Sequence, residues 1–282
     1  MKSAILKTAA AASAVFLLAG CGSSASAGTD NGTVSTVKSG VLTVGLSPDF
    51  PPMEYLDPTT NTLTGADVDL VNEIAKRLDL KVEFTQQKFD QLINSVKTER
   101  VDMTFSGMSD TVERQKTVDF VDYFKSVGRF YTTAANKDKF TKATDACGQP
   151  VAVSSATDYF PKLQQFSKDT CTAAGLPEVN IIPTDSGAAA RLQLDQGRAL
   201  LAIQGAENLV YFAQQNPGKY DMVLPDLTNT PFGAAVKKGN SALEEKVQKA
   251  FAAMNSDGTT KKILDKYNVG YGLMDPVING VK

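Results

Sequence analysis

The sequence contains no histidine, which excludes several kinds of enzyme. Without an imidazole, neither a Ser-His-Asp nor a Cys-His catalytic arrangement is possible, and the commonest zinc ligand is missing. No Gly-x-Gly-x-x-Gly or P-loop pattern occurs, so nothing indicates nucleotide binding. The formal net charge is only −2, and no basic region points to nucleic acid. We therefore expect no cofactor, no resident metal and no nucleic-acid partner.

What is present suits an ordinary soluble protein of two parts. A length of 282 residues favours two domains of typical size. Hydrophobic residues make up 42% of the chain and charged residues 21%, as in average globular domains. That composition supplies enough apolar material for one core in each part.

The first 20 residues are predicted to be a signal peptide. Lys2 and Lys7 accompany an apolar run over residues 8–20, which is shorter than the roughly 20 residues of a membrane-spanning helix. The run ends in Leu-Ala-Gly before Cys21, which resembles the bacterial lipobox, in which the cysteine carries a lipid. The alternative is an ordinary secretory signal cut nearby. Both interpretations place the mature protein outside the cytoplasm, and the lipobox adds a membrane anchor at Cys21.

Residues 21–40 are predicted to form a flexible tether. This segment is rich in glycine, serine, threonine and alanine and has few bulky apolar residues. Such a segment buries too little surface to order itself. A lipid-anchored domain would need a tether of this kind to stand clear of the membrane.

Cysteine is scarce, and the two that follow Cys21 are predicted to form a disulfide. Cys147 and Cys171 are an even pair in an oxidising compartment. A metal site is the weaker interpretation, because two thiols without histidine do not complete a zinc shell. Two free buried thiols are the other alternative.

Apolar periodicity from residue 41 onward alternates between strands and helices. Strands are expected at 41–46, 81–85, 101–105, 151–153, 179–182, 200–203 and 222–224. Helices are expected at 67–78 and 89–96, and from residues 111, 186, 206, 241 and 259. This alternation predicts parallel sheets covered on both faces. Polar breaks at 137–149 and 226–232 are compatible with three serial domains or with one domain inserted into another.

Residues 101–120 contain the clearest candidate site, a turn between a strand and a short helix. The turn has hydroxyl groups and a glycine, and amides before a helix favour a negative group. Asp110 is the expected N-cap of the helix, with Glu113 completing a capping box. Arg114 follows one turn later, where its planar guanidinium could hold a carboxylate. The alternative is a surface arginine paired with Glu113 or Asp119.

The chain from residue 41 to 269 resembles the family 3 extracellular solute-binding proteins of bacterial ABC importers, in the polar amino acid group. The motifs that carry the resemblance are GADVDL at 65–70, FDQLINSVKTERVDM at 89–103, SGMSDTVERQKTVDF at 106–120 and SDGTTKKILDKYNV at 256–269. They occur in the family's order and span nearly the whole mature chain.

The resemblance implies an α/β, two-lobed periplasmic-binding-protein-like fold (type II) with two crossing hinge strands. Residues 41–131 plus 232–282 would form the first lobe, and residues 135–228 an inserted second lobe. The implied function is a monomeric substrate-binding lipoprotein that captures an amino acid or related small carboxylate between closing lobes and presents it to an ABC permease. The alternative is an enzyme on the same fold that resembles cyclohexadienyl dehydratase, with Glu207 or Asp158 as general acid.

The resemblance also implies ligand contacts. Arg114 would clamp the α-carboxylate together with the Ser109 hydroxyl and the Gly107 amide, and Ser106 would lie near the ammonium. The remaining implied contacts are the walls Phe50 and Phe89, the second-lobe turn at Thr157 and Asp158, and the neutral amide of Gln204. Core packing is the alternative for both phenylalanines. A plain N-cap is the alternative for Thr157.

Two positions depart from the family pattern. Gly205 stands where an aspartate usually pairs with the α-ammonium, and a buried ammonium without an anion is costly. Either Glu207 or Asp158 takes that role, or the ligand has no α-ammonium. Glu207 has a second interpretation, a carboxylate placed favourably at a helix N-terminus. Ser47 stands where some members carry an acid for cationic side chains, although Asp49 is close.

Overall fold

The computed structural model describes residues 35–282, which belong to one compact unit. The predicted signal peptide, Cys21 and most of the predicted tether lie outside these residues. Across residues 35–282, no helix combines the length and the apolar character needed to cross a membrane.

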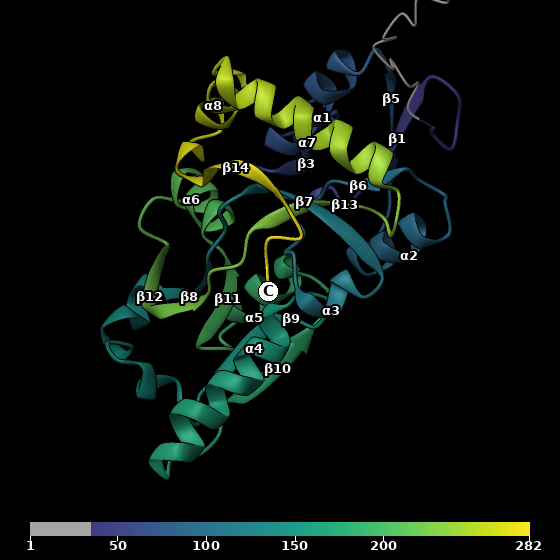
Figure 1. Ribbon diagram of the computed structural model, residues 1–282. Coiled ribbons are helices and arrows are strands. Elements are labelled where there is room, and N and C mark those ends of the chain that lie inside the picture. The colour runs from purple at the N-terminus through teal and green to yellow at the C-terminus, as the bar shows by residue number, and fades with distance from the viewer. Residues whose placement is uncertain (1–34) are drawn as a thin grey trace, which may run out of the picture. The chain divides into compact units, whose positions relative to one another are not determined.

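The described chain contains two main sheets and one small one (Figure 1). The first sheet has the order β14 (Leu273–Ile278), β7 (Val118–Phe124), β13 (Phe232–Lys237), β6 (Met103–Thr104), β1 (Val41–Leu46) and β5 (Lys81–Gln86). The second has the order β10 (Asn180–Thr184), β9 (Pro150–Ser154), β11 (Leu201–Gly205), β8 (Gly128–Thr133) and β12 (Tyr220–Thr228). The small sheet joins β2 (Asp49–Phe50), β3 (Glu54–Leu56) and β4 (Leu63–Thr64).

Helices cover these sheets. The α-helices are α1 (Ala66–Arg77), α2 (Leu92–Lys97), α3 (Val112–Gln115), α4 (Tyr159–Phe166), α5 (Gly187–Asp195), α6 (Ala206–Gln215), α7 (Ser241–Ser256) and α8 (Thr259–Lys266). Short helical turns are η1 (Phe89–Gln91), η2 (Ala134–Lys139), η3 (Ala143–Ala146), η4 (Ser167–Cys171), η5 (Thr172–Ala174) and η6 (Gly270–Gly272).

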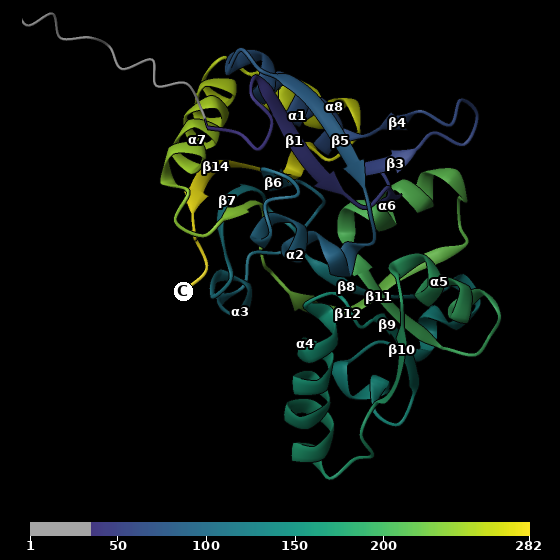
Figure 2. The ribbon, with the colours of Figure 1, turned by 90° about the vertical axis from the view of Figure 1, so that its right-hand side faces the viewer.

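Side-chain alternation on β1 shows how the first sheet is buried on both faces. Leu42 and Val44 are fully buried in a core shared with α1, α7 and α8. Gly45 points to the other face, where a Cβ atom would lie 3.3 Å from Leu92 of α2. Figure 2 shows α2 and α1 on opposite sides of this sheet. An apolar strand between two helical layers is the expected product of strand–helix alternation.

Both main sheets are mixed, whereas alternation alone predicted parallel sheets. β1 pairs with β5 and β6 in parallel, and β9 pairs with β10 and β11 in parallel. The antiparallel pairs all involve β7, β8, β12, β13 or β14. Each of these pairs contains β7, β8, β12 or β13, the strands that flank the two crossings between the sheets, so strand–helix alternation does not set their direction.

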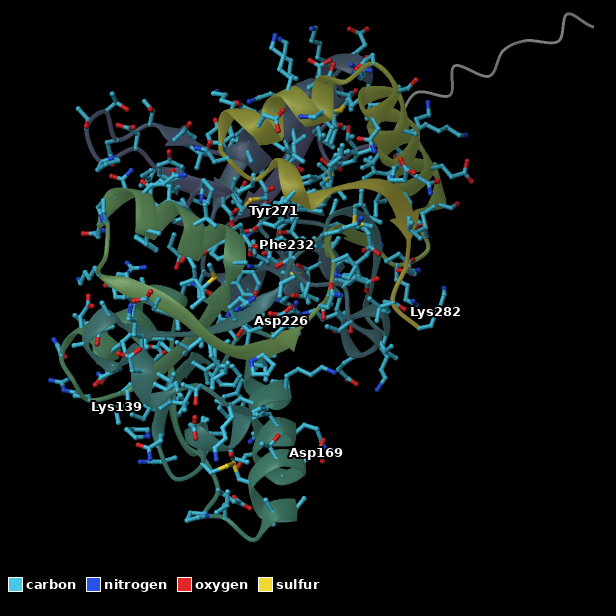
Figure 3. All side chains as sticks on the ribbon, turned by 90° about the vertical axis from the view of Figure 1, so that its left-hand side faces the viewer. Lys139, Asp169, Asp226, Phe232, Tyr271 and Lys282 are labelled. Atoms are coloured by element: carbon cyan, nitrogen blue, oxygen red, sulfur yellow. A yellow bond between two sulfur atoms is a disulfide. The ribbon has the colours of Figure 1, made fainter. Side chains whose placement is uncertain are left out.

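The chain crosses between the two main sheets at residues 125–127 and 229–231. β7 and β8 flank the first crossing, and β12 and β13 flank the second. Figure 3 labels Asp226 and Phe232 on either side of the second crossing. The inserted arrangement of two lobes stays a prediction, with which these crossings are compatible. β8 pairs within the second sheet, although the predicted first lobe extended to residue 131.

The predicted disulfide between Cys147 and Cys171 is confirmed. The two Cα atoms lie 5.4 Å apart, and the bond joins the segment before β9 to η4. Cys171 is fully buried against the core of the second sheet. The bond therefore closes a loop of 24 residues around α4.

We expect loss of this cross-link to weaken the fold. Replacing both Cys147→Ser and Cys171→Ser should lower the free energy of unfolding by about 3 kcal/mol, because the unfolded chain regains loop freedom. Urea denaturation measures the change. Wild-type protein unfolded in a reducing agent is the matched control and should show a similar loss. An unchanged midpoint in both experiments would contradict the prediction.

Candidate functional site

A cavity of about 440 Å³ lies between residues from the two main sheets. Its lining consists of Ser47, Asp49, Phe50, Lys88, Phe89, Asp90, Ser106, Gly107, Ser109, Arg114, Ser154, Ser155, Ala156, Thr157, Asp158, Tyr159, Asp185, Ser186, Gly187 and Gln204. Nine of the ten predicted contact residues are in this set, and Glu207 is not. The cavity is the size of a small-molecule site.

The backbone explains why these residues converge. Ser47 directly follows β1, Lys88 follows β5, and Asp185 follows β10. In open α/β sheets, the carboxyl ends of parallel strands meet at one edge, and ligands bind there. The motif comparison missed some lining residues, such as Asp185. Their position at the end of a strand was the feature of the sequence that could have identified them.

Ser106 is held in the binding turn by a fully buried glutamate. Its hydroxyl donates to Oε1 of Glu54 at 2.7 Å and accepts from the amide of Ser47 at 2.9 Å. Burial and the neighbouring Asp67 raise the pKa of Glu54 well above its usual range. Because the one hydroxyl proton of Ser106 is used, its free lone pair can only accept a hydrogen bond from a ligand. That polarity suits the predicted place of Ser106 near an ammonium.

Gly107 differs from its predicted role as an amide donor to the ligand. Its N–H donates to Oδ2 of Asp67 at 2.9 Å, and Tyr123 donates to the same oxygen at 2.8 Å. Burial raises the pKa of Asp67 to about 6. Gly107 adopts φ of 50°, and a Cβ there would lie 2.8 Å from the ring of Phe50. The absence of a side chain at Gly107 thus permits the turn and the close approach of the Phe50 ring. The Gly107 amide is used in the hydrogen bond to Asp67.

The short helix after the turn begins one residue later than predicted. Thr111 is the N-cap, since its hydroxyl accepts from the amide of Arg114 at 3.2 Å. Asp110 is instead fully buried and accepts from the side-chain amide of Gln115 at 2.8 Å. Glu113 pairs with Lys116 on the surface and forms no capping box. The predicted cap was wrong because the Asp110 carboxylate also accepts from the distant amide of Val281 at 3.3 Å and so faces away from the helix N-terminus.

Arg114 lines the cavity and is hydrogen-bonded to residues of both lobes. Its guanidinium donates to the carbonyl of Ser109 at 2.8 Å and to the carbonyl of Ala156, on the second lobe, at 3.2 Å. The guanidinium lies 5.6 Å from the ring centre of Phe89. Desolvation lowers the pKa of Arg114, yet an arginine keeps its charge in a protein. Among the described residues these two bonds occupy two of five N–H donors, so three can serve a carboxylate.

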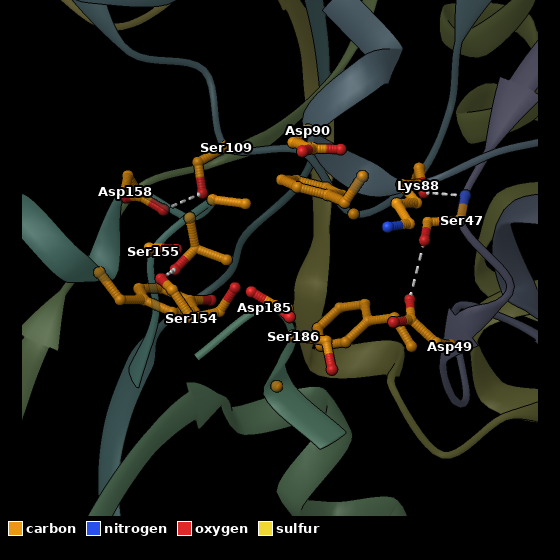
Figure 4. Close-up of a pocket in the computed structure, with 18 of the residues that line it drawn as sticks. Ser47, Asp49, Lys88, Asp90, Ser109, Ser154, Ser155, Asp158, Asp185 and Ser186 are labelled. Carbon is orange, nitrogen blue, oxygen red and sulfur yellow. Dashed lines mark hydrogen bonds between the residues drawn. The ribbon is translucent and has the colours of Figure 1, made fainter. Parts of the chain in front are cut away.

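Ser109 and Asp158 form a direct link between the lobes. The hydroxyl of Ser109 donates to Oδ1 of Asp158 at 2.8 Å, as Figure 4 shows. Oδ2 of Asp158 has no hydrogen-bond partner within residues 35–282, and the residue is 8% exposed. The hydroxyl of Thr157 donates to the carbonyl of Ser154 at 2.9 Å. A ligand carboxylate could therefore gain the Ser109 proton only by displacing Asp158.

The predicted walls are in place. Phe50 and Phe89 are both half-buried and line the cavity. Phe50 also packs edge-on against Phe232 with ring centres 6.0 Å apart, so it belongs to the core as well. Gln204 is 7% exposed at the end of β11 and lies against Gly187, where a Cβ would be 1.9 Å from its side-chain nitrogen. Phe50 and Gln204 are therefore held in place by packing contacts of their own.

Glu207 differs from its predicted position at the cleft. The side chain is fully buried, accepts from Ser126 at 3.1 Å and from the exposed Tyr271 at 3.4 Å, and does not line the described cavity. Burial raises the pKa of Glu207 to about 8. A Cβ on Gly205 would lie 1.8 Å from its Oε1, so the glycine makes room for this carboxyl group. Packing therefore explains why position 205 is a glycine and not an aspartate, since any side chain there would collide with Glu207.

The other end of the cavity has Asp49 and Lys88 in its lining (Figure 4). Figure 4 shows Asp49 and Ser47 at the end opposite Asp158 and Ser109, with Asp185 between them. The hydroxyl of Ser47 donates to Asp49 at 3.0 Å. Desolvation raises the pKa of Asp49, although the Ser47 hydrogen bond acts in the opposite direction. A cation beside Asp49 would favour its ionised form.

Comparison with known proteins identifies the family. Residues 42–270 match the bacterial extracellular solute-binding proteins, family 3. The chain belongs to this family. This match confirms the family that the sequence motifs indicated. It also confirms the predicted location of the protein outside the cytoplasm.

Several relatives are similar over most of the chain. The putative ABC transporter arginine-binding protein 2 of Escherichia coli (strain K12) is 31% identical, over 77% of this chain and 86% of that protein. The L-cystine-binding protein TcyA of Bacillus subtilis (strain 168) is 28% identical, over 90% of this chain and 92% of that one. The structure of an ancestral arginine-binding protein bound to arginine is 33% identical, with a TM-score of 0.72 over 81% and 98% of the two chains.

These family 3 relatives decide two further points. Structural matches to two-lobed arginine-binding proteins confirm the predicted fold class. The relatives are named for binding and not for catalysis, so the chain is a solute-binding protein and the dehydratase-like alternative is not supported. Glu207, one of the two candidate general acids, is also enclosed away from the cavity.

The raised pKa of Glu207 predicts a fall in stability with rising pH. The folded protein keeps this proton up to about pH 8, whereas the unfolded chain releases it near its usual value of 4.5. The free energy of unfolding should fall between these values, on the order of 1 kcal/mol per pH unit for one retained proton. Glu207→Gln is permanently neutral and should show a smaller fall from pH 6 to 8 in urea denaturation.

The exposed Glu245 provides the matched control for this experiment. Glu245→Gln removes one acidic side chain without changing the buried site, so its pH profile should follow the wild type. A Glu207→Gln profile identical to that of the wild type would show that the carboxyl group does not hold its proton in the folded protein.

Proposed function

We propose that this solute-binding protein captures an amino acid with a positively charged side chain for an ABC importer. The observation that carries the proposal is the charge of the cavity. Its lining contains the four aspartates Asp49, Asp90, Asp158 and Asp185 against the two cations Lys88 and Arg114. An amino acid head group is neutral as a zwitterion, so the surplus of carboxylates suits a cationic side chain.

The proposed ligand would lie along the cavity with its carboxylate at Arg114. The three remaining guanidinium donors support a charge-assisted, two-point contact. Phe50 and Phe89 would enclose the aliphatic part of the side chain. The cationic end would reach Asp49 at the other end of the cavity (Figure 4). Relatives named for arginine binding support the same ligand class.

A binding comparison between arginine and citrulline tests the side-chain charge. The two molecules have nearly the same shape, but the ureido group of citrulline is neutral. By isothermal titration calorimetry, L-arginine should bind more tightly by at least about ten-fold, with L-glutamate weaker still. The arginine advantage should shrink as salt rises. Equal binding of arginine and citrulline would refute the cationic ligand class.

Replacing the guanidinium tests the carboxylate contact. Arg114→Ala should weaken binding of the preferred amino acid by about 100-fold or more, because a desolvated charge pair is lost. Arg114→Lys should recover only part of the affinity, since an ammonium cannot form the planar two-point contact. Arg198→Ala, an exposed arginine outside the cavity lining, is the control and should bind like the wild type. Unchanged affinity in Arg114→Ala would remove the proposed carboxylate site.

The membrane anchor is part of the same proposal, although Cys21 lies outside the described residues. We expect lipidation at Cys21 and recognition of the ligand-bound form by permease subunits, with the protein acting as a monomer. Cys21→Ser expressed in a bacterial host with its full leader should lose incorporation of labelled palmitate and leave the membrane fraction. Continued membrane attachment of this variant would contradict the lipid anchor.

A further inference from the structure

An amino acid ligand brings an α-ammonium group into the cavity, and this charge needs an acceptor there. The question rests on the proposed function, since it assumes an amino acid. A desolvated ammonium is costly without a nearby anion or several hydrogen-bond acceptors. The carboxylate and ammonium of an amino acid are attached to the same carbon atom. The acceptor must therefore lie close to the Arg114 end of the cavity.

Most acidic groups around the cavity are excluded by their position. Glu207 is fully buried behind Gly205, with Ser126 and Tyr271 as partners. Glu54 is enclosed behind Ser106 and lies outside the lining. Asp49 lies at the opposite end in Figure 4, and Asp185 is an exposed residue between the two ends. Asp90 also lines the cavity and, like Asp185, is exposed, so both carboxylates stay hydrated. These acidic groups are therefore buried behind the wall, distant from the carboxylate contact or exposed to water.

Asp158 meets the requirement. It lines the cavity, is 8% exposed, and its Oδ1 is fixed by the Ser109 hydroxyl at 2.8 Å. Its Oδ2 is a buried acceptor without a partner in the described chain. It also follows Ala156 by two residues, and the carbonyl of Ala156 accepts from Arg114 at 3.2 Å. A buried carboxylate oxygen without a donor is expensive unless a donor arrives.

We propose that the free Oδ2 of Asp158 binds the α-ammonium of the ligand. Arg114 on the first lobe and Asp158 on the second then hold the two charges of one head group. The Ser109–Asp158 hydrogen bond orients the carboxylate in advance, so little freedom is lost on binding. Selection for an amino group thus comes from the second lobe, and the lone pair of Ser106 provides a second acceptor on the first.

The test measures the binding of two ligands to two forms of the protein. L-Arginine is compared with argininic acid, in which a hydroxyl replaces the α-ammonium, on wild-type protein and on Asp158→Asn. Asparagine keeps the size of the side chain and an acceptor for Ser109 but removes the negative charge. Wild-type protein should prefer arginine by about ten-fold or more, and Asp158→Asn should reduce that preference to within about three-fold. A preference that survives in Asp158→Asn overturns the proposal.

Controls keep the result interpretable. If Asp158→Asn shows no thermal unfolding transition, Asp158→Ser replaces it as the neutral variant. We expect the same reduced preference for arginine over argininic acid in Asp158→Ser. Glu207→Gln should keep the wild-type preference. Loss of the preference in Glu207→Gln, with retention in Asp158→Asn, would assign the ammonium to Glu207 and overturn the inference.

The experiment separates this inference from the proposed ligand class. If the wild-type protein binds a neutral amino acid and not arginine, the cationic class fails. The Asp158 inference is then tested with that amino acid and its 2-hydroxy acid. If the wild-type protein binds the hydroxy acid as tightly as the amino acid, the Asp158 inference fails whatever the side chain. Binding of no amino acid at all overturns both.

Discussion

The hydrogen bond from Ser109 to Asp158 is the contact on which the organisation of the cavity depends. It joins the turn of the first lobe to the start of α4 in the second, at a distance of 2.8 Å. It uses the Ser109 proton and leaves the buried Oδ2 of Asp158 without a hydrogen-bond partner among residues 35–282. The same contact therefore joins the lobes and indicates what a ligand must supply, which is a hydrogen-bond donor with positive charge.

Behind the cavity, buried carboxyl groups provide the framework. Glu54 and Asp67 hold the turn at Ser106 and Gly107. Glu207 fills the space that a side chain at position 205 would need. Burial raises the pKa of all three carboxyl groups, which favours their protonated forms and limits the cost of enclosing them. Buried carboxyl groups outside the cavity lining therefore orient the short polar groups that line the cavity.

Much of the fold was predictable because it follows local periodicity. The strand at 41–46 and the helices beginning at Ala206, Ser241 and Thr259 agree with the apolar pattern. The mixed sheets were not predictable in this way, because pairing direction depends on where the chain crosses between lobes. The short β2–β4 sheet also carried too few residues for a periodic signal.

The sequence alone determined the chemical types at the site, namely an arginine after a serine-rich turn, aromatic walls and a glycine at position 205. It also predicted the disulfide, because only two cysteines follow Cys21, and the structure confirms the bond. Only the tertiary structure decided which of these groups remain available. The Gly107 amide is used by Asp67, Glu207 is enclosed, and Asp158 keeps one free oxygen. The physical reason is that hydrogen-bond partners and desolvation depend on residues 40 to 81 positions apart, which local sequence patterns do not encode.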